Sequence, residues 1–236
     1  MSQPVKRAGR KAVNTEAIRE PRGARRKRET RGRLLEAALK LMSEKGMEGV
    51  AINEITEAAD VGFGSFYNHF DSKESIHAAL VGHLFEEFFD QLDELGRRID
   101  DPAEVIAVAV RHTLLRAQRE PTWGKFLIRE GLSSRLLTRS ERLMRDVQRG
   151  ATSKRLTVTD PLTSVIAVGG TILTAVATQL LKSHQSGAVT LGKSSFDTKD
   201  LPERAATVAL QILGLSPREA EKIARRPLPA LDATAE

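Results

Sequence analysis

Residues 60–70, which read DVGFGSFYNHF, crowd glycines, aromatic rings and a histidine into one short stretch. Glycine is unfavourable inside a helix, so Gly64 must serve something other than helix stability. It could allow a bend that only packs, or a surface that comes very close to another molecule. Ser65 and Asn68 carry groups that can hydrogen-bond base edges, and Tyr67 offers a phenol to a phosphate oxygen. Contact with nucleic acid is therefore the chemistry that this stretch suggests.

The elements around this stretch are predicted to be helices. Apolar residues recur at intervals of three and four over about residues 26–45, and Gly46 then provides a stop signal. A shorter apolar stripe covers residues 52–59, and the DVG that follows is typical of a turn, with Gly62 free to adopt the backbone angles of the corner. A further short helix begins at Phe63. This order predicts a helix-turn-helix, whose second helix enters the DNA major groove.

The stretch AINEITEAADVGFGSFYNHFDSKESI resembles the N-terminal DNA-binding domain of the TetR family of bacterial transcription regulators. The resemblance covers about residues 30–80 and is carried by Ile55, Ala58, Ala59, Val61, Gly64, Ser65, Phe66, Tyr67, His69, Phe70, Lys73 and Glu74. Three residues depart from the family pattern: Asp60 replaces a turn glycine, Gly62 a serine cap and Ala51 a threonine. These changes weaken caps and one phosphate contact and leave the predicted fold intact.

Two faces are expected on the helix that starts at Phe63. Phe66 and Phe70 lie four residues apart, share one face and are expected to pack in the core. The opposite face and its surroundings are expected to contact DNA, through Phe63, Gly64, Ser65, Tyr67, Asn68, His69 and Lys73. The phosphate contact of His69 is implied by the resemblance, and core packing is its alternative. Lys73 lies at the start of the next helix, where backbone N–H groups also favour phosphate.

Basic residues are concentrated before residue 34. Residues 1–33 contain twelve Lys and Arg against three Glu, a charge of +9 within a chain of net charge +6. Residues 34–80 contain three lysines against eight acidic residues, so the helix-turn-helix itself repels DNA. We expect the basic arm to supply phosphate contacts, through Arg25, Arg26, Lys27, Arg28 and Arg31, with Arg33 beside them. A solvated tail is the alternative.

The rest of the sequence predicts further helices. An apolar face from about residue 73 to 99 predicts a helix of about 27 residues, which in the TetR family would transmit the ligand state to the DNA-binding domain. Helices starting at Pro102 and Pro121 carry the residues expected to bind an effector, namely His112, Arg116, Trp123, Phe126, Leu127 and Glu130. Core packing is the alternative for Trp123, and a solvated helix face is the alternative for the arginines.

Residues 162–181 contain no charged side chain across about 20 positions, the length that a bilayer requires. Several of these residues are Thr, Ser or Gln, and Asp160 and Pro161 precede them as a helix start. We therefore favour a subunit interface over a membrane span. Small residues that allow close approach recur at Thr163, Ala167, Gly170, Thr174 and Ala177, and residues 200–214 would complete a four-helix bundle with the partner.

Other classes of function are disfavoured by the sequence. The absence of cysteine excludes disulfides and thiolate chemistry, and no P-loop or complete dinucleotide fingerprint is present. His83 and Glu87 lie one helical turn apart but lack a third ligand, so no metal and no cofactor are expected. The first residues contain no signal peptide pattern, which favours a cytoplasmic protein.

The sequence thus predicts an all-α protein with an N-terminal three-helix helix-turn-helix domain and a larger C-terminal helical domain for ligand binding and dimerisation. The expected segments are a disordered basic arm (1–25), the DNA-binding domain (26–75), the effector and dimerisation domain (76–215) and a tail (216–236). The expected function is a homodimeric repressor, not an enzyme, that binds a palindromic operator in double-stranded DNA and is released by an apolar small molecule. The alternatives are a TetR-like protein controlled by a protein partner or acting architecturally and, more distantly, a helical enzyme.

Overall fold

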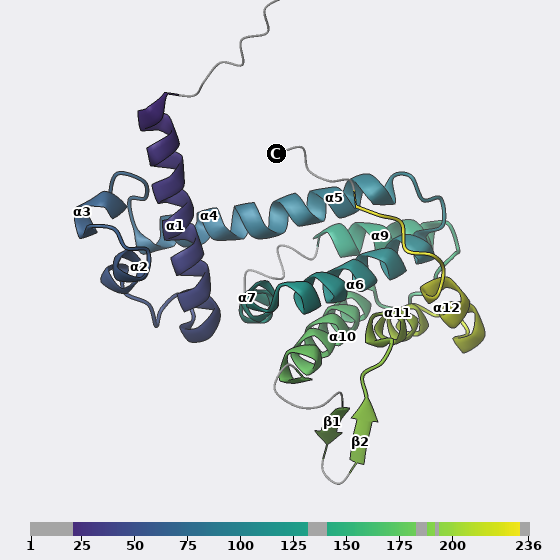
Figure 1. Cartoon of the computed structure of the whole chain (residues 1–236). Coiled ribbons are helices and arrows are strands. Elements are labelled where there is room, and N and C mark those ends of the chain that lie inside the picture. Colours follow the sequence, from purple (N-terminus) through teal and green to yellow (C-terminus); the bar gives the residue numbers. More distant parts are fainter. Residues whose placement is uncertain (1–20, 132–140, 183–187, 192–193, 232–236) are drawn as a thin grey trace, which may run out of the picture.

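The N-terminal domain consists of α1 (Arg22–Lys45), α2 (Ile52–Ala58) and α3 (Phe63–Phe66), followed by α4 (Lys73–Val81) (Figure 1). The computed structural model describes residues 21–131, 141–182, 188–191 and 194–231. Most of the expected arm, residues 1–20, lies outside the described residues, but its last part belongs to α1, which begins earlier than predicted. Phe66 and Phe70 are buried as expected, in a core with residues such as Leu34, Ile55 and Ile76.

The turn between α2 and α3 depends on Asp60, not on Gly62. Asp60 has φ 52°, in the left-handed region that aspartate tolerates better than most residues. Gly62 has φ −65° and ψ 145°, an extended conformation open to any residue, so the expectation that this glycine supplies unusual backbone angles was wrong. Arg33 donates from Nη1 to the carbonyl oxygen of Asp60 at 3.3 Å, which fixes the turn to α1.

A continuous helical rod leads from the DNA-binding domain into the C-terminal domain (Figure 1). It comprises α4, the π-helical segment η1 (Gly82–Glu86) and α5 (Glu87–Gly96). The sequence predicts this rod but not the change of hydrogen-bond pattern within it, which marks functional hinges in many helices. The carbonyl of Leu84 in this segment accepts hydrogen bonds from Trp123 Nε1 at 3.2 Å and from Arg116 Nη1 at 3.3 Å.

The C-terminal domain is built around α6 (Pro102–Arg119), which packs against α7 (Pro121–Gly131), α9 (Glu141–Thr152), α10 (Pro161–Lys182), α11 (Leu201–Ile212) and α12 (Pro217–Ala224). Asp101 caps α6 by accepting from Ala103 N at 3.0 Å, and Pro102 occupies the first turn, where its missing N–H costs nothing. The buried side chains of these helices form one core with those of the rod, including Phe85, Leu114, Trp123 and Leu210.

A short antiparallel hairpin separates α10 from α11. Strands β1 (Ala188–Leu191) and β2 (Ser194–Asp197) pair with Val189 opposite Phe196, and the hairpin projects away from the helices (Figure 1). The sequence predicts an all-α protein, so no strand pair is expected there. Its alternation is too short to be recognised as a strand pair.

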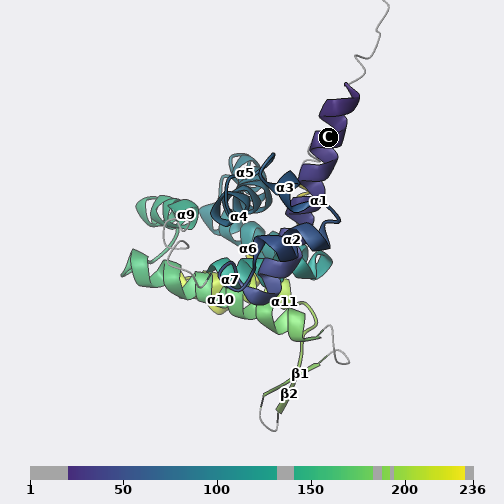
Figure 2. The ribbon, with the colours of Figure 1, turned by 90° about the vertical axis from the view of Figure 1, so that its left-hand side faces the viewer.

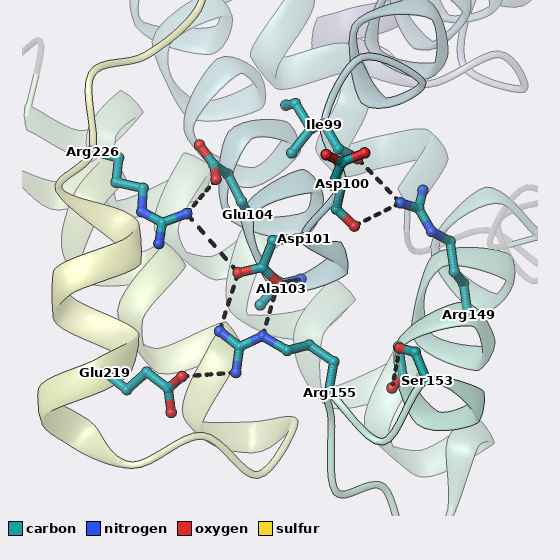
Figure 3. A network of polar contacts seen from close by, with 11 residues as sticks. Ile99, Asp100, Asp101, Ala103, Glu104, Arg149, Ser153, Arg155, Glu219 and Arg226 are labelled. Atoms are coloured by element: carbon teal, nitrogen blue, oxygen red, sulfur yellow. Dashed lines mark hydrogen bonds and ion pairs between the residues drawn. The ribbon is translucent and has the colours of Figure 1, made fainter.

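The expected C-terminal tail contains a helix and is fastened to the domain. Ile223 of α12 is buried, and Ser216 caps this helix. Arg155 bridges Asp101 and Glu219, with Nε to Asp101 Oδ1 at 2.9 Å and Nη1 to Glu219 Oε1 at 2.7 Å (Figure 3). Arg226 pairs with Glu104 in the same network. Residues 217–231 are therefore part of the domain, a difference that arises from contacts between segments distant in sequence.

Candidate nucleic-acid interface and ligand cavity

The face of the α3 region that points away from the buried Phe66 is exposed. Phe63 and Tyr67 have exposed fractions of 54% and 50%, and their rings contact each other with centroids 5.6 Å apart. Gly64 and Asn68 are also exposed, and a Cβ added at Gly64 would meet no atom within 4 Å. The structure therefore presents two aromatic edges, an amide and a bare stretch of backbone on one face. Such a set can contact a thymine methyl, a base edge and a nearby phosphate.

Basic residues of α1 line a groove with the end of α3. The groove is formed by Arg26, Lys27, Thr30, Ser65, Asn68 and His69. Burial lowers the pKa of His69, and the charges of Lys27 and Arg31 act in the same direction, so the neutral imidazole is favoured. Its Nδ1 is buried without a hydrogen-bond partner among the described residues. The groove therefore combines fixed cations with neutral donors, as a phosphate contact requires.

Two other residues predicted to contact DNA, Lys73 and Arg31, interact with neighbouring parts of the N-terminal domain. Lys73 donates from Nζ to the carbonyl oxygen of Glu48 at 3.4 Å, and the two side chains are 4.0 Å apart. The guanidinium of Arg31 lies over the ring of Phe70, 5.0 Å from its centroid. Arg25 forms an exposed ion pair with Glu29 at 3.3 Å, and Arg28 lies on the exposed part of α1. The predicted arginines and Lys27 thus lie along α1, and Lys73 lies at the start of α4.

An apolar cavity of about 160 Å³ lies in the C-terminal domain between α5, α6, α7, α9 and α10. Its apolar wall includes Phe89, Leu92, Ile106, Val110, Leu127, Leu143, Ile172 and Leu173. A cavity of about 150 Å³ is known to hold one benzene molecule. This cavity can therefore hold a single six-membered ring, and it is too small for a long acyl chain.

Charged side chains occupy one side of the cavity. Asp93 accepts from Arg145 Nη2 at 2.7 Å and pairs with Arg142 Nη1 at 3.1 Å. That Arg142 nitrogen is buried and makes no hydrogen bond within the described residues, so a ligand oxygen could accept from it. Asp146 lies 3.9 Å from Arg145 Nε. Burial raises the pKa of Asp146, and the neighbouring charge of Asp93 raises it further, against the opposing effects of Arg145 and Arg149. The cavity can therefore donate to and accept from hydroxyl groups on a ring.

Of the six residues predicted to bind an effector, Leu127 alone is among those that line this cavity. Trp123 and Phe126 are buried against Phe85, and Trp123 and Arg116 donate to Leu84 as described above. His112 contacts the carbonyl oxygen of Pro229 at 3.0 Å. Glu130 pairs with His77 at 2.9 Å. These five residues do not line this cavity, because their side chains meet the rod and the C-terminal segment, and their binding of an effector stays a prediction.

The sequence missed Asp93, Arg142 and Asp146. Their signal is a set of charges spaced by three and four residues on two helices, Asp90 with Asp93 and Arg142 with Asp146. Each set alone reads as a solvated helix face. The two sets face each other across 52 positions in the chain, as the pair of Arg142 Nη2 with Asp90 Oδ1 at 2.7 Å shows.

Helix α7 connects the cavity wall to the DNA-binding domain. Leu127 lines the cavity, and two residues later Arg129 donates from Nε to the carbonyl oxygen of Ser43 at 2.7 Å and also contacts the carbonyl of Glu44. Glu130 pairs with the buried His77 of α4. A Cβ at Gly131 would come within 2.6 Å of cavity-lining Leu173, so α7 and α10 are in close contact there. Helix α7 therefore contacts the cavity wall on one side and α1 and α4 on the other.

The outer face of α10 is apolar and uncovered. Leu162, Ile166 and Leu181 have exposed fractions of 55%, 53% and 67%, and Val208 on α11 is exposed to 45%. Of the five small residues predicted for an interface, Thr163, Ala167, Gly170 and Thr174 are exposed and Ala177 is half-buried. Among the described residues, Pro161–Leu181 is the one helix long and apolar enough to cross a membrane, with 22% of its most apolar window buried. Gly169, Ile172 and Leu173 of the same helix line the cavity.

Models of two protein families match the chain. Residues 34–80 match the bacterial regulatory proteins of the tetR family, and residues 101–226 match the tetracyclin repressor-like C-terminal domain. The chain belongs to the TetR family. Its members and the relatives named below are transcriptional regulators, so this TetR-family protein is a regulator and not an enzyme.

Curated relatives of this TetR-family protein match part of its length. The HTH-type transcriptional repressor DhaR of Mycobacterium sp. is 45% identical over 62 residues, 26% of this chain and 29% of that protein. The repressor KstR of Mycolicibacterium smegmatis is 30% identical over 99 residues, 42% of this chain and 48% of that protein. The matches thus span less than half of these relatives' lengths.

Solved structures match most of the chain. The crystal structure of RolR in complex with resorcinol is 31% identical, covers 88% of this chain and 99% of that chain, and has a TM-score of 0.62. FadR from Bacillus subtilis in complex with stearoyl-CoA has a TM-score of 0.63 at 17% identity, covering 78% of this chain and 99% of that chain. The second similarity concerns the fold alone. Together they show an N-terminal helix-turn-helix domain followed by a larger helical domain.

Proposed function

We propose that this TetR-family protein is a homodimeric repressor that binds a two-fold symmetric operator and releases it when a small hydroxylated aromatic compound enters the cavity. The observation that carries the proposal is the cavity itself, an apolar space of about 160 Å³ with Asp93, Arg142 and Asp146 on one side. Its size suits one ring. Its polar groups suit ring hydroxyls, which both donate and accept hydrogen bonds. The structure of RolR with resorcinol, a dihydroxybenzene, supports the same ligand class at 31% identity.

We assign DNA contact to the exposed residues of α3 and to the cations of α1. Asn68 can read a base edge, while Tyr67 and the groove at His69 suit phosphates. The three lysines and eight acidic residues of positions 34–80 leave that region net negative. The affinity for phosphate must then come largely from Arg25, Arg26, Lys27, Arg28 and Arg31, which lie on α1.

We assign dimerisation to the outer face of α10 together with α11. The exposed leucine and isoleucine side chains of α10 and four of its five small residues are free of contacts that bury them in the described chain, whereas Val165, Val168 and Val176 form its buried face. In a soluble protein, both faces of a helix that is apolar on two sides are buried against other apolar surface. A second copy, packed across a two-fold axis, covers this face and pairs two α3 helices for one operator. We also propose a cytoplasmic location, because the operator DNA that such a regulator binds lies there.

The DNA assignment is tested with operators selected from a random duplex pool by the full-length protein. Affinity for the selected and random duplexes is then measured over a range of salt concentrations. We expect Asn68→Ala to reduce the preference for the selected sequence by about 1–3 kcal/mol, with little change in the salt dependence. Failure of the pool to converge on any sequence, or an Asn68→Ala protein with full preference, would contradict the assignment of α3 as the reading helix.

A further inference from the structure

The first turns of α1 extend beyond the body of the N-terminal domain (Figures 1 and 2). Residues 21–29 are all exposed, and the first fully buried residue of the helix is Leu34. From Arg22 to Arg33 the helix rises by about 16 Å at about 1.5 Å per residue. This segment, residues 22–32, is called the α1 extension below. Packing against the rest of the described chain contributes little to the stability of this helical segment. Its conformation therefore depends on interactions between residues close in sequence.

Those local interactions oppose a helix in the free protein. The extension and Arg33 together contain seven Arg and Lys against one Glu. Like charges recur at helical spacing, as in Arg22 with Arg26 and Lys27 with Arg31, and such pairs destabilise a helix. The first turn has no acidic residue and no side-chain cap, so the positive end of the helix dipole meets further positive charge. The exposed ion pair of Arg25 with Glu29 offsets little of this.

Gly32 lies where the extension joins the anchored part of the helix. On its two sides, Arg33 donates to the carbonyl of Asp60 at 3.3 Å and Arg31 lies over the Phe70 ring. A Cβ at Gly32 would meet no atom within 4 Å, so no close packing requires a glycine there. Glycine in an exposed helix interior favours the unfolded conformation relative to alanine. Residue 32 is therefore the weak point at which the extension can separate from the helix.

The extension leaves the domain on the side that carries the DNA-contacting residues. Arg26, Lys27 and Thr30 share one groove with Ser65, Asn68 and His69 of the α3 region. A strand of DNA held by α3 would continue past this groove toward Arg22. Phosphates there would neutralise the repulsion that opposes the helix. Charge complementarity and continuity with the α3 groove thus identify the DNA backbone as the occupant.

We infer that the α1 extension folds onto DNA: residues 22–32 complete their helix only against the phosphate backbone beside the half-site that α3 contacts. This inference rests on the proposed DNA-binding function. It has a quantitative consequence, because part of the binding free energy is used to order the extension. Because of Gly32, the affinity for DNA is lower than the same charges would give if the helix were already formed in the free protein.

Two substitutions at one position test the inference without changing charge. Gly32→Ala favours the helix and fits the open space. Gly32→Pro removes the N–H of residue 32 and clashes with the carbonyl of Arg28, but proline is well suited to the first turn of the shortened helix that begins there. Thermal unfolding of both variants establishes that the domain remains folded. The probe is a duplex of random sequence, with affinity measured by fluorescence anisotropy over a range of salt concentrations.

We expect Gly32→Ala to bind about fivefold more tightly for each bound subunit, which corresponds to about 1 kcal/mol at 1.4 kcal/mol per tenfold change. We expect Gly32→Pro to bind more weakly, with a salt slope smaller by about 0.9 for every phosphate that the variant no longer neutralises. Hydrogen exchange of the wild-type amides at residues 26–32 is expected to be fast in the free protein and slowed by DNA.

Three results separate the possibilities. Equal affinities and slopes for wild type, Gly32→Ala and Gly32→Pro would show that the charges act as a flexible tail. Strong amide protection in the free protein would show a preformed helix. Either result overturns the inference and leaves DNA binding intact. If the wild-type protein itself binds no duplex at low salt, the proposed function fails as well.

Discussion

Arg129 of α7 donates from Nε to the carbonyl oxygen of Ser43 at 2.7 Å, and this contact joins the two domains. Ser43 lies in the last turn of α1, where carbonyl groups lack partners within the helix and the dipole is negative. A guanidinium is well placed there because it carries a charge and several donors. Since Leu127 lines the cavity one half-turn earlier, α7 contacts both the cavity and the end of α1.

We predict that Arg129→Ala separates ligand binding from DNA release. The cavity does not include Arg129, so ligand affinity should stay within about twofold of wild type, whereas the factor by which ligand weakens operator binding should fall several-fold. Couplings of about 1–3 kcal/mol are typical of such linked sites. Lys125→Ala removes an exposed charge from the same helix and serves as the control. Calorimetry gives ligand affinity and anisotropy gives DNA affinity; undiminished coupling in Arg129→Ala would place the transmission elsewhere.

Asp146→Asn should weaken ligand binding without weakening the fold. Loss of one hydrogen bond of about 0.5–1.5 kcal/mol corresponds to an affinity about twofold to tenfold lower. Because burial raises the pKa of Asp146, its ionised form is disfavoured in the folded protein, and its contribution to stability decreases as pH rises above the ordinary Asp range. At neutral pH the variant should therefore be at least as stable as wild type, and the difference should vanish below about pH 4. Thermal unfolding at pH 7 and below pH 4 measures the difference in stability between Asp146→Asn and wild type. A variant that is less stable than wild type at pH 7 would contradict the prediction.

Gly170→Leu should produce a monomer. In a single chain, a Cβ at Gly170 meets no atom within 4 Å, so leucine fits the isolated fold and improves helix propensity. In the proposed dimer the same side chain separates the two α10 helices, and operator affinity falls because the half-sites are no longer bound together. Gln148→Leu, at an exposed position of α9, is the control for an added surface leucine. Sedimentation of a Gly170→Leu dimer with unchanged affinity would mean that this face does not meet a partner.

Asp101→Ala should lower stability in a pH-dependent manner. Burial acts to raise the pKa of Asp101, but hydrogen bonds from Arg155 and Ala103 N and the charges of Arg155 and Arg226 outweigh it, so the pKa is lowered (Figure 3). The carboxylate therefore stabilises the fold above the ordinary Asp pKa of about 3.9, and this contribution is lost as pH falls through and below that value.

At pH 7 the loss of the cap and the ion pair should cost about 1–2 kcal/mol, which lowers the melting temperature by about 2–8 °C. The effect should shrink as pH falls below 4. Asp100→Ala is the matched control, since Asp100 contributes its backbone carbonyl to Arg149. Equal melting temperatures for Asp101→Ala and Asp100→Ala at pH 7 would argue against a stabilising network.

Local patterns were sufficient to predict the helices of the N-terminal domain. The spacing of Phe66 and Phe70 predicts their shared face, and the structure confirms the burial of both rings, whereas the role of Asp60 in the turn was assigned to Gly62. The cavity depends instead on pairs such as Asp93 with Arg142, which are distant in sequence and resemble a solvated surface on each helix. The sequence alone assigns Trp123 to the ligand because periodicity shows which residues share a helix face and not which element that face meets.

The central claim is that a single-ring aromatic ligand in the cavity releases the protein from DNA. The most direct measurement is a titration of resorcinol into the complex of the full-length protein with its selected operator, followed by fluorescence anisotropy. The account predicts release of DNA over the same concentrations at which calorimetry detects binding to the free protein, and a shift to higher concentrations for Asp146→Asn. Unchanged operator affinity at saturating resorcinol and at saturating concentrations of other single-ring phenols would contradict the account.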